Sequence, residues 1–111
     1  MEDAVRDFSP EKSASYIVRG DCDLYSAPVF KEAVLKKIDA GIRHIRIDMT
    51  AVDYLDSSGV GAIICIIKAA KRSGGDVRFH GLAGSPRKVL ARTNILGLIN
   101  EGTGPIENPA V

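Results

Sequence analysis

The residues best suited to chemistry occupy positions 56–61, where the sequence reads Asp-Ser-Ser-Gly-Val-Gly. A carboxylate and two hydroxyls, those of Asp56, Ser57 and Ser58, stand side by side where a helical pattern begins. Asp and Ser are preferred helix caps, so capping alone is the simplest explanation of their presence. A helix N-terminus also tolerates negative charge, so a hydroxyl at this point could carry a phosphoryl group.

The expected surroundings of this segment favour a functional site. Residues 56–61 follow a strand that ends near Asp48, and ligand sites in open α/β sheets lie outside the carboxyl ends of strands. The helix that begins here is apolar well beyond one stripe, so it is either buried on most sides or offers surface to a partner. Gly59 and Gly61 each cost the helix up to about 1 kcal/mol relative to Ala, and they let another group approach the backbone closely.

The remaining elements follow from the alternation of apolar and polar residues. The pattern predicts strands at 4–8, 15–19, 42–48 and 76–80. It predicts one helix from an N-cap at Ser26 to Gly41, a second from Ser57 to Gly74, and a third opened by Ser85 and Pro86. Residues 49–55 are expected to form a connection, and residues 94–100 a helix end with a short strand.

This order predicts an α/β domain with a small mixed sheet. Turn formers at 9–13 predict an N-terminal hairpin, which would add an antiparallel edge. Single helices between the later strands predict parallel pairing with right-handed crossovers. We expect one domain over residues 1–111, with a core at about 5–100 flanked by helices and an irregular tail at 101–111.

Composition excludes several classes of protein. Fifteen Lys and Arg against fourteen Asp and Glu leave a net charge of +1, so nothing requires a nucleic-acid partner. Two cysteines without metal-ligand spacing, and no phosphate-cradling glycine loop, predict neither a metal nor a cofactor. The longest apolar run, residues 59–67, is about half the ~20 residues that a membrane span needs. With no signal peptide at its start, the chain is expected to be cytoplasmic.

At residues 56–61 the sequence resembles the signature of the STAS-domain anti-sigma factor antagonists, also called anti-anti-sigma factors. Residues 20–28, Gly-Asp-Cys-Asp-Leu-Tyr-Ser-Ala-Pro, are similar to a second block of that family, which precedes its first helix. The spacing of the two blocks also fits, and the resemblance covers roughly residues 5 to 100. It implies the STAS fold and a protein that is not itself an enzyme.

The resemblance also implies a switch. Unphosphorylated members bind an anti-sigma factor, which is also a serine kinase of the histidine-kinase-like ATPase class, and so release a sigma factor. Phosphorylation of the residue that matches Ser58 ends this binding, and a PP2C-type phosphatase restores it. Asp23, Asp56, Ser57 and Gly59 would lie around Ser58 in the region that faces the partner. Ser57 remains the second choice as acceptor, and Asp23 is expected to serve binding rather than stability.

The chain departs from the family pattern at three places. Asp21 stands where Glu is common, and Cys22 stands where an aliphatic residue is usual. The end of the chain, 102–111, contains Pro105 and Pro109 and does not resemble the family's closing helix.

Three alternatives stay open. The same fold could serve as a scaffold subunit of a stress-sensing or lipid-transport assembly. A serine hydrolase would use Ser58 as nucleophile, His80 as base and Asp48 as orienter, but the Gly-x-Ser-x-Gly elbow is missing. A phosphoaspartate receiver built on Asp48 would need a lysine after the strand at 76–80, where Ala83 and Gly84 stand instead.

Overall fold

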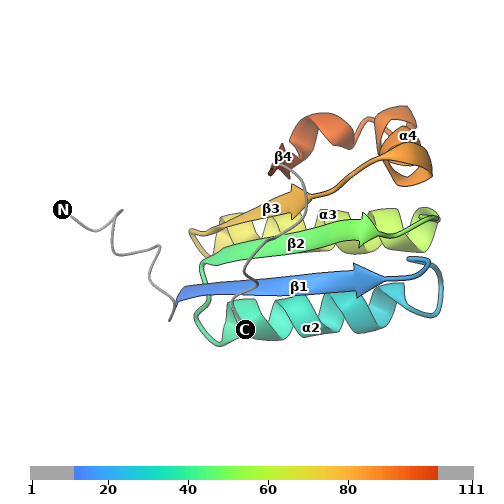
Figure 1. Cartoon of the computed structure of the whole chain (residues 1–111). Helices are drawn as coiled ribbons and strands as arrows, with labels where there is room; N and C mark the ends of the chain where they lie inside the picture. Colours follow the sequence, from blue (N-terminus) through green and yellow to red (C-terminus); the bar gives the residue numbers. More distant parts are fainter. Residues whose placement is uncertain (1–11, 103–111) are drawn as a thin grey trace.

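The structure is a computed structural model that describes residues 12–102 of the 111-residue chain (Figure 1). Its elements, in chain order, are β1 (Ser13–Arg19), α2 (Ala27–Asp39), β2 (His44–Ala51), α3 (Ser57–Arg72), β3 (Asp76–His80), α4 (Gly84–Arg92), the 3-10 helix η2 (Leu96–Leu98) and β4 (Asn100–Glu101).

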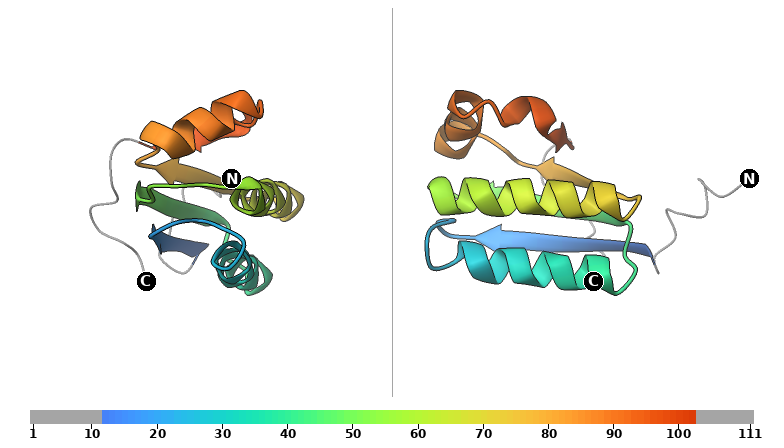
Figure 2. Two further views of the ribbon diagram at one scale, coloured as in Figure 1. Left: turned by 90° about the vertical axis from the view of Figure 1, so that its right-hand side faces the viewer. Right: turned by 180° about the vertical axis from the view of Figure 1, so that it is seen from behind.

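The strands form one sheet in the order β1-β2-β3-β4, and every pair within the described residues is parallel. Helices α2 and α3 cover the same face of this sheet, and α4 lies beyond β3, on the side away from β1 (Figure 2). The predicted α/β class with parallel strands is therefore confirmed. The first strand of the predicted hairpin, 4–8, and the tail from residue 103 onward lie outside the described residues.

The ladder between β1 and β2 contains one irregularity close to its carboxyl end. Ile17 pairs with Asp48, but the next pair is Arg19 with Ala51, so β2 has one residue more than β1 between the two pairs. Such a bulge bends a strand locally and is common beside functional sites. It lies just before the two loops that carry the candidate site.

Two predicted boundaries were wrong. The strand predicted at 42–48 is β2 at His44–Ala51, so Met49 to Ala51 are strand and not connection. Met49 is only 1% exposed, and burial of its side chain in the core extends the strand past the predicted end. Glu101, assigned to the irregular tail, lies in β4, where its backbone pairs with that of Phe79.

The core lies between the sheet and its two covering helices. Ile63 and Ile66 of α3 are fully buried, as is Phe79 of β3, and the ring of Tyr16 stacks on that of Phe30 with centroids 5.5 Å apart. Burial of this apolar face outweighs the low helix propensity of the two glycines in α3. Within residues 12–102, no helix has both the length and the apolar character needed to cross a bilayer.

Candidate functional site

The two sequence blocks meet at the carboxyl edge of the sheet. The loop between β1 and α2, residues 20–26, lies beside the loop between β2 and α3, residues 52–56 (Figure 1). Cys22 and Leu55 form an isolated parallel bridge between them. The Cys22 N–H donates to the Tyr54 carbonyl at 2.8 Å, and the Asp56 N–H donates to the Cys22 carbonyl at 3.2 Å. The parallel pairing of β1 and β2 thus continues into the loops.

The Asp56 side chain has two roles at once. Its Oδ1 accepts hydrogen bonds from the backbone N–H groups of Ser58, at 2.8 Å, and Gly59, at 3.1 Å, and so caps α3. Its Oδ2 accepts from the Leu24 N–H at 3.1 Å, in the neighbouring loop. The capping interpretation is therefore correct for Asp56. Within the described residues, neither serine hydroxyl of the segment takes part in a hydrogen bond.

Gly59 is the point of closest approach between the two loops. A Cβ at this position would overlap the Leu55 side chain and stand 2.7 Å from the Cys22 carbonyl oxygen. Only glycine leaves room for that backbone, which explains a glycine in the first turn of a helix. Gly61, by contrast, faces open space, with nothing within 4 Å of a Cβ built on it.

Asp23 organises the first loop. Its Oδ1 accepts hydrogen bonds from the backbone N–H groups of Tyr25 and Ser26, both at 3.0 Å. These bonds, together with one from the Ser26 hydroxyl, stabilise the carboxylate and lower its pKa below the ordinary 3.8. Ser26 occupies the expected N-cap position of α2, but its hydroxyl donates to the Asp21 carbonyl at 2.6 Å instead of capping the helix. These hydrogen bonds give Asp23 a local structural role, and its expected role in binding stays a prediction.

Cys22 is fully buried beneath the two loops. Burial raises the pKa of its thiol to about 11, with further contributions from the charges of Asp56 and Asp23. The side chain is therefore a neutral thiol at physiological pH. It packs as a small apolar residue between the two loops.

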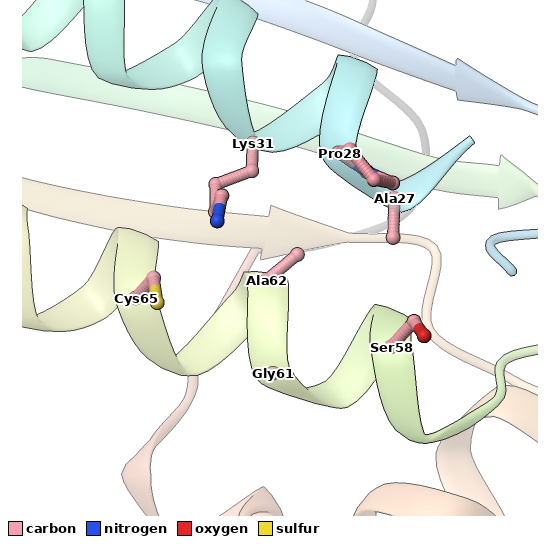
Figure 3. A pocket seen from close by; sticks show the side chains of 7 residues that line it. All are labelled: Ala27, Pro28, Lys31, Ser58, Gly61, Ala62 and Cys65. Atoms are coloured by element: carbon pink, nitrogen blue, oxygen red, sulfur yellow. The ribbon is translucent and has the colours of Figure 1, made fainter. Parts of the chain in front are cut away.

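Ser58 lines a groove of about 290 Å³ between α2 and α3 (Figure 3). The residues that line this groove are Ala27, Pro28 and Lys31 from α2 and Ser58, Gly61, Ala62 and Cys65 from α3. Ser57 is exposed and is not among the lining residues, so the two neighbouring serines differ in surroundings. Ser58 is partly buried, and in the close view it lies at the N-terminal end of α3, across from Ala27.

Large apolar side chains are exposed around the two loops. Leu24 is 62% exposed, Tyr25 83%, Val29 64% and Tyr54 50%, and we call these four the loop-edge patch. Among the described residues, the one other large hydrophobic side chain exposed to this degree is Leu98, in η2. No sequence pattern predicted this patch, although Leu24 and Tyr25 stand in a loop where no core position is expected.

The hydrolase alternative finds no support in this geometry. Asp48 and His80 are partners in the register of β2 and β3, and neither lines the groove that contains Ser58. The Asp48 carboxylate accepts the backbone N–H of Thr50 at 2.8 Å. No histidine, aspartate or glutamate lines the groove to act as the base that a serine nucleophile needs.

Comparison with known proteins agrees with this architecture. Residues 13–108 match the STAS domain. The anti-sigma-B factor antagonist of Bacillus subtilis (strain 168) is 33% identical over 81 residues, which cover 73% of this chain and 71% of that protein. The anti-sigma factor antagonist SpoIIAA in its unphosphorylated form has a TM-score of 0.73 at 16% identity, over 84% of this chain and 82% of that one.

A second solved structure is the Bacillus cell fate determinant SpoIIAA in its phosphorylated form. It has a TM-score of 0.66 at 15% identity and covers 84% of this chain and 85% of its own. At such identities the two solved structures establish a common fold and nothing more. Together with the family match over residues 13–108 and the 33% identical relative, they lead to one assignment: the chain belongs to the STAS domain family.

Proposed function

We propose that the chain is an anti-sigma factor antagonist that binds its anti-sigma factor while Ser58 is unphosphorylated. The single observation that carries the proposal is the position of Ser58, whose hydroxyl takes part in no hydrogen bond among the described residues and lies in a groove next to the loop-edge patch. Relatives named as antagonists of an anti-sigma factor support this role. The chain acts in this proposal by binding and not by catalysis.

The partner is in this proposal both binding target and kinase, a serine kinase of the histidine-kinase-like ATPase class. The Ser58 oxygen attacks the γ-phosphorus of the ATP that the kinase holds, an O–P bond forms, the bond to ADP breaks and the hydroxyl proton passes to a base of the kinase. A PP2C-type phosphatase reverses the modification by hydrolysis, which releases inorganic phosphate. The cycle takes place in the cytoplasm, where ATP and sigma factors meet.

Phosphorylation ends binding through charge and not through refolding. A phosphoryl group adds about −1.5 to −2 charges at a site where Asp56 and Asp23 already place two carboxylates nearby. A partner seated on the apolar loop-edge patch would have to desolvate that dianion. A 100-fold loss of affinity corresponds to about 2.7 kcal/mol, which lies within the roughly 2–5 kcal/mol that an unpaired buried charge costs. The forms of SpoIIAA with and without phosphate both have this fold, which supports a switch without refolding.

The predicted partner-facing residues divide by exposure. Ser57 is exposed and Asp23 partly so, and in this proposal both contact the anti-sigma factor. Gly59 is buried and Asp56 uses its carboxylate within the loops, so these two act by holding Ser58 and the patch in place.

The proposal is tested by incubating the purified chain with its anti-sigma factor and ATP and measuring intact mass. One phosphate should be added, and peptide mapping should place it on Ser58. Ser58→Ala should abolish the mass shift, whereas Ser57→Ala, the matched control, should retain it. Phosphate on Ser57 would reassign the acceptor. A chain that binds no anti-sigma factor at all would favour the scaffold role.

A further inference from the structure

Lys31 brings a positive charge into the groove that contains Ser58. Its side chain extends from α2 into the space between the two helices, and it lines the same groove as Ser58, which lies at the N-terminal end of α3 (Figure 3). Of the seven residues that line the groove, Lys31 alone is charged. Within residues 12–102, its ammonium forms no ion pair. A cation without a counter-charge therefore lies in the groove.

The charged residues of the two loops next to Ser58, 20–26 and 52–56, are all acidic. Asp56 precedes it and caps the same helix, and Asp23 lies in the adjoining loop. The first turn of α3 contains no acidic residue of its own. A dianionic phosphate on Ser58 would meet repulsion from the two loop carboxylates and attraction from Lys31, so its preferred direction is into the groove.

We propose that Lys31 is the residue that receives the phosphoryl group on Ser58 and holds it in the groove between α2 and α3. The proposal rests on the proposed function, because it concerns the phosphorylated state of the same serine. The Lys31 ammonium, on its flexible four-carbon stem, donates charge-assisted hydrogen bonds to phosphate oxygens. On the α3 side, Gly61 and Ala62 line the groove next to Ser58, so no large side chain there would obstruct the phosphate.

This contact changes what the partner meets. In the unphosphorylated chain the groove is open and carries the Lys31 charge. In the phosphorylated chain the ion pair would fill the entrance of the groove and neutralise that charge. Phosphorylation would then remove a groove and a cation from the binding surface, in addition to introducing an anion. Lys31 is in this sense a positioning residue of the switch.

The test uses protein with phosphoserine incorporated at position 58 during translation, so that no kinase is needed. The second pKa of the phosphate, ordinarily near 6, is measured by phosphorus NMR during a pH titration. Lys31→Gln should raise this pKa by about half a pH unit, the effect of one unit charge across a hydrated contact. Lys36→Gln, which removes the same charge from an exposed position of α2 outside the groove lining, should leave it unchanged.

Two further variants sharpen the test. Lys31→Arg keeps the charge and should keep the low phosphate pKa, and 1 M salt should reduce the difference between Lys31→Gln and the parent protein. Equal phosphate pKa values in Lys31→Gln and Lys36→Gln would overturn the inference. That result would leave the proposed function intact, because phosphorylation by the anti-sigma factor is measured separately on the unmodified chain.

Discussion

The Asp56 carboxylate accepts the backbone N–H of Leu24 at 3.1 Å, across 32 residues of sequence. The same carboxylate caps the helix that presents Ser58. The candidate phosphoacceptor and the first residue of the loop-edge patch are therefore fixed to one side chain. A substitution in either loop is therefore expected to change the conformation of the other loop as well.

Gly59→Ala should destabilise the domain, because the new methyl group would meet the Cys22 carbonyl and the Leu55 side chain. Forcing a methyl into such a packed site costs about 1–3 kcal/mol. Gly61→Ala is the matched control: it introduces the same atom two residues later, in open space, and should stabilise α3 by roughly 0.5–1 kcal/mol. Urea denaturation of both variants measures the two free energies of unfolding. Equal effects of the two substitutions would contradict the close approach at Gly59.

Asp23 should make the stability of the domain depend on pH. Because hydrogen bonds lower the pKa of its carboxyl below 3.8 in the folded state, the ionised form stabilises the fold. This contribution is fully present above the unfolded pKa and is lost as pH falls through the folded one. The difference in free energy of unfolding between the parent and Asp23→Asn should therefore shrink in that acidic window. A difference that stayed constant down to the lowest pH would show that the charge of Asp23 plays no part.

Tyr25→Ala should weaken binding of the anti-sigma factor, because Tyr25 is the most exposed member of the loop-edge patch. Exposed aromatic residues at the centre of an interface can contribute more than about 1 kcal/mol, so we expect at least about a fivefold loss of affinity. Leu98→Ala removes an exposed side chain from η2, away from the patch, and should bind normally. Calorimetric titration gives both affinities, and thermal melts show whether either variant has lost stability. Equal affinities for the two variants would place the interface elsewhere.

Ser58→Glu should weaken binding of the anti-sigma factor without lowering the stability of the domain. A negative charge in the first turn of α3 favours the isolated fold by roughly 0.3–1 kcal/mol, whereas the complex must desolvate that charge beside Asp56. The melting temperature should stay level or rise while the dissociation constant for the anti-sigma factor increases. The loss should be smaller than with phosphate, because a carboxylate carries one charge. An affinity that fell only in proportion to lost stability would instead indicate a conformational switch.

The parts of the site that depend on local chemistry were predictable from the sequence. A cap at Asp56, a helix from Ser57 and a glycine that allows close approach all follow from residue types over a few positions, and the structure contains each of them. Position 58 was preferred over 57 only by resemblance. The structure adds a physical difference between the two serines, because the groove between α2 and α3 is lined by Ser58 and not by Ser57.

The parts that depend on pairing between distant segments were not predictable. The bridge between Cys22 and Leu55 requires the register of β1 on β2, which no local pattern contains. The same holds for Lys31, whose place in the groove depends on how α2 packs against α3. Its spacing in the sequence indicated only a polar helix face. The extension of β2 through Ala51 was missed because the end of the strand does not alternate: Asp48 and Met49 are both buried, and Thr50 and Ala51 are both exposed.

The bulge between β1 and β2 makes the two loops sensitive to length. Each strand residue advances the chain by about 3.3 Å, so losing the extra β2 residue between the pairs Ile17–Asp48 and Arg19–Ala51 would shift one loop along the other by that amount. The Asp56 carboxylate would then no longer reach the Leu24 amide. Deletions and insertions in these two strands should thus be far less tolerated than in the turn at Ser73 to Gly75, which lies at the opposite edge of the sheet. The register of β1 on β2 therefore sets the position of one loop of the site relative to the other.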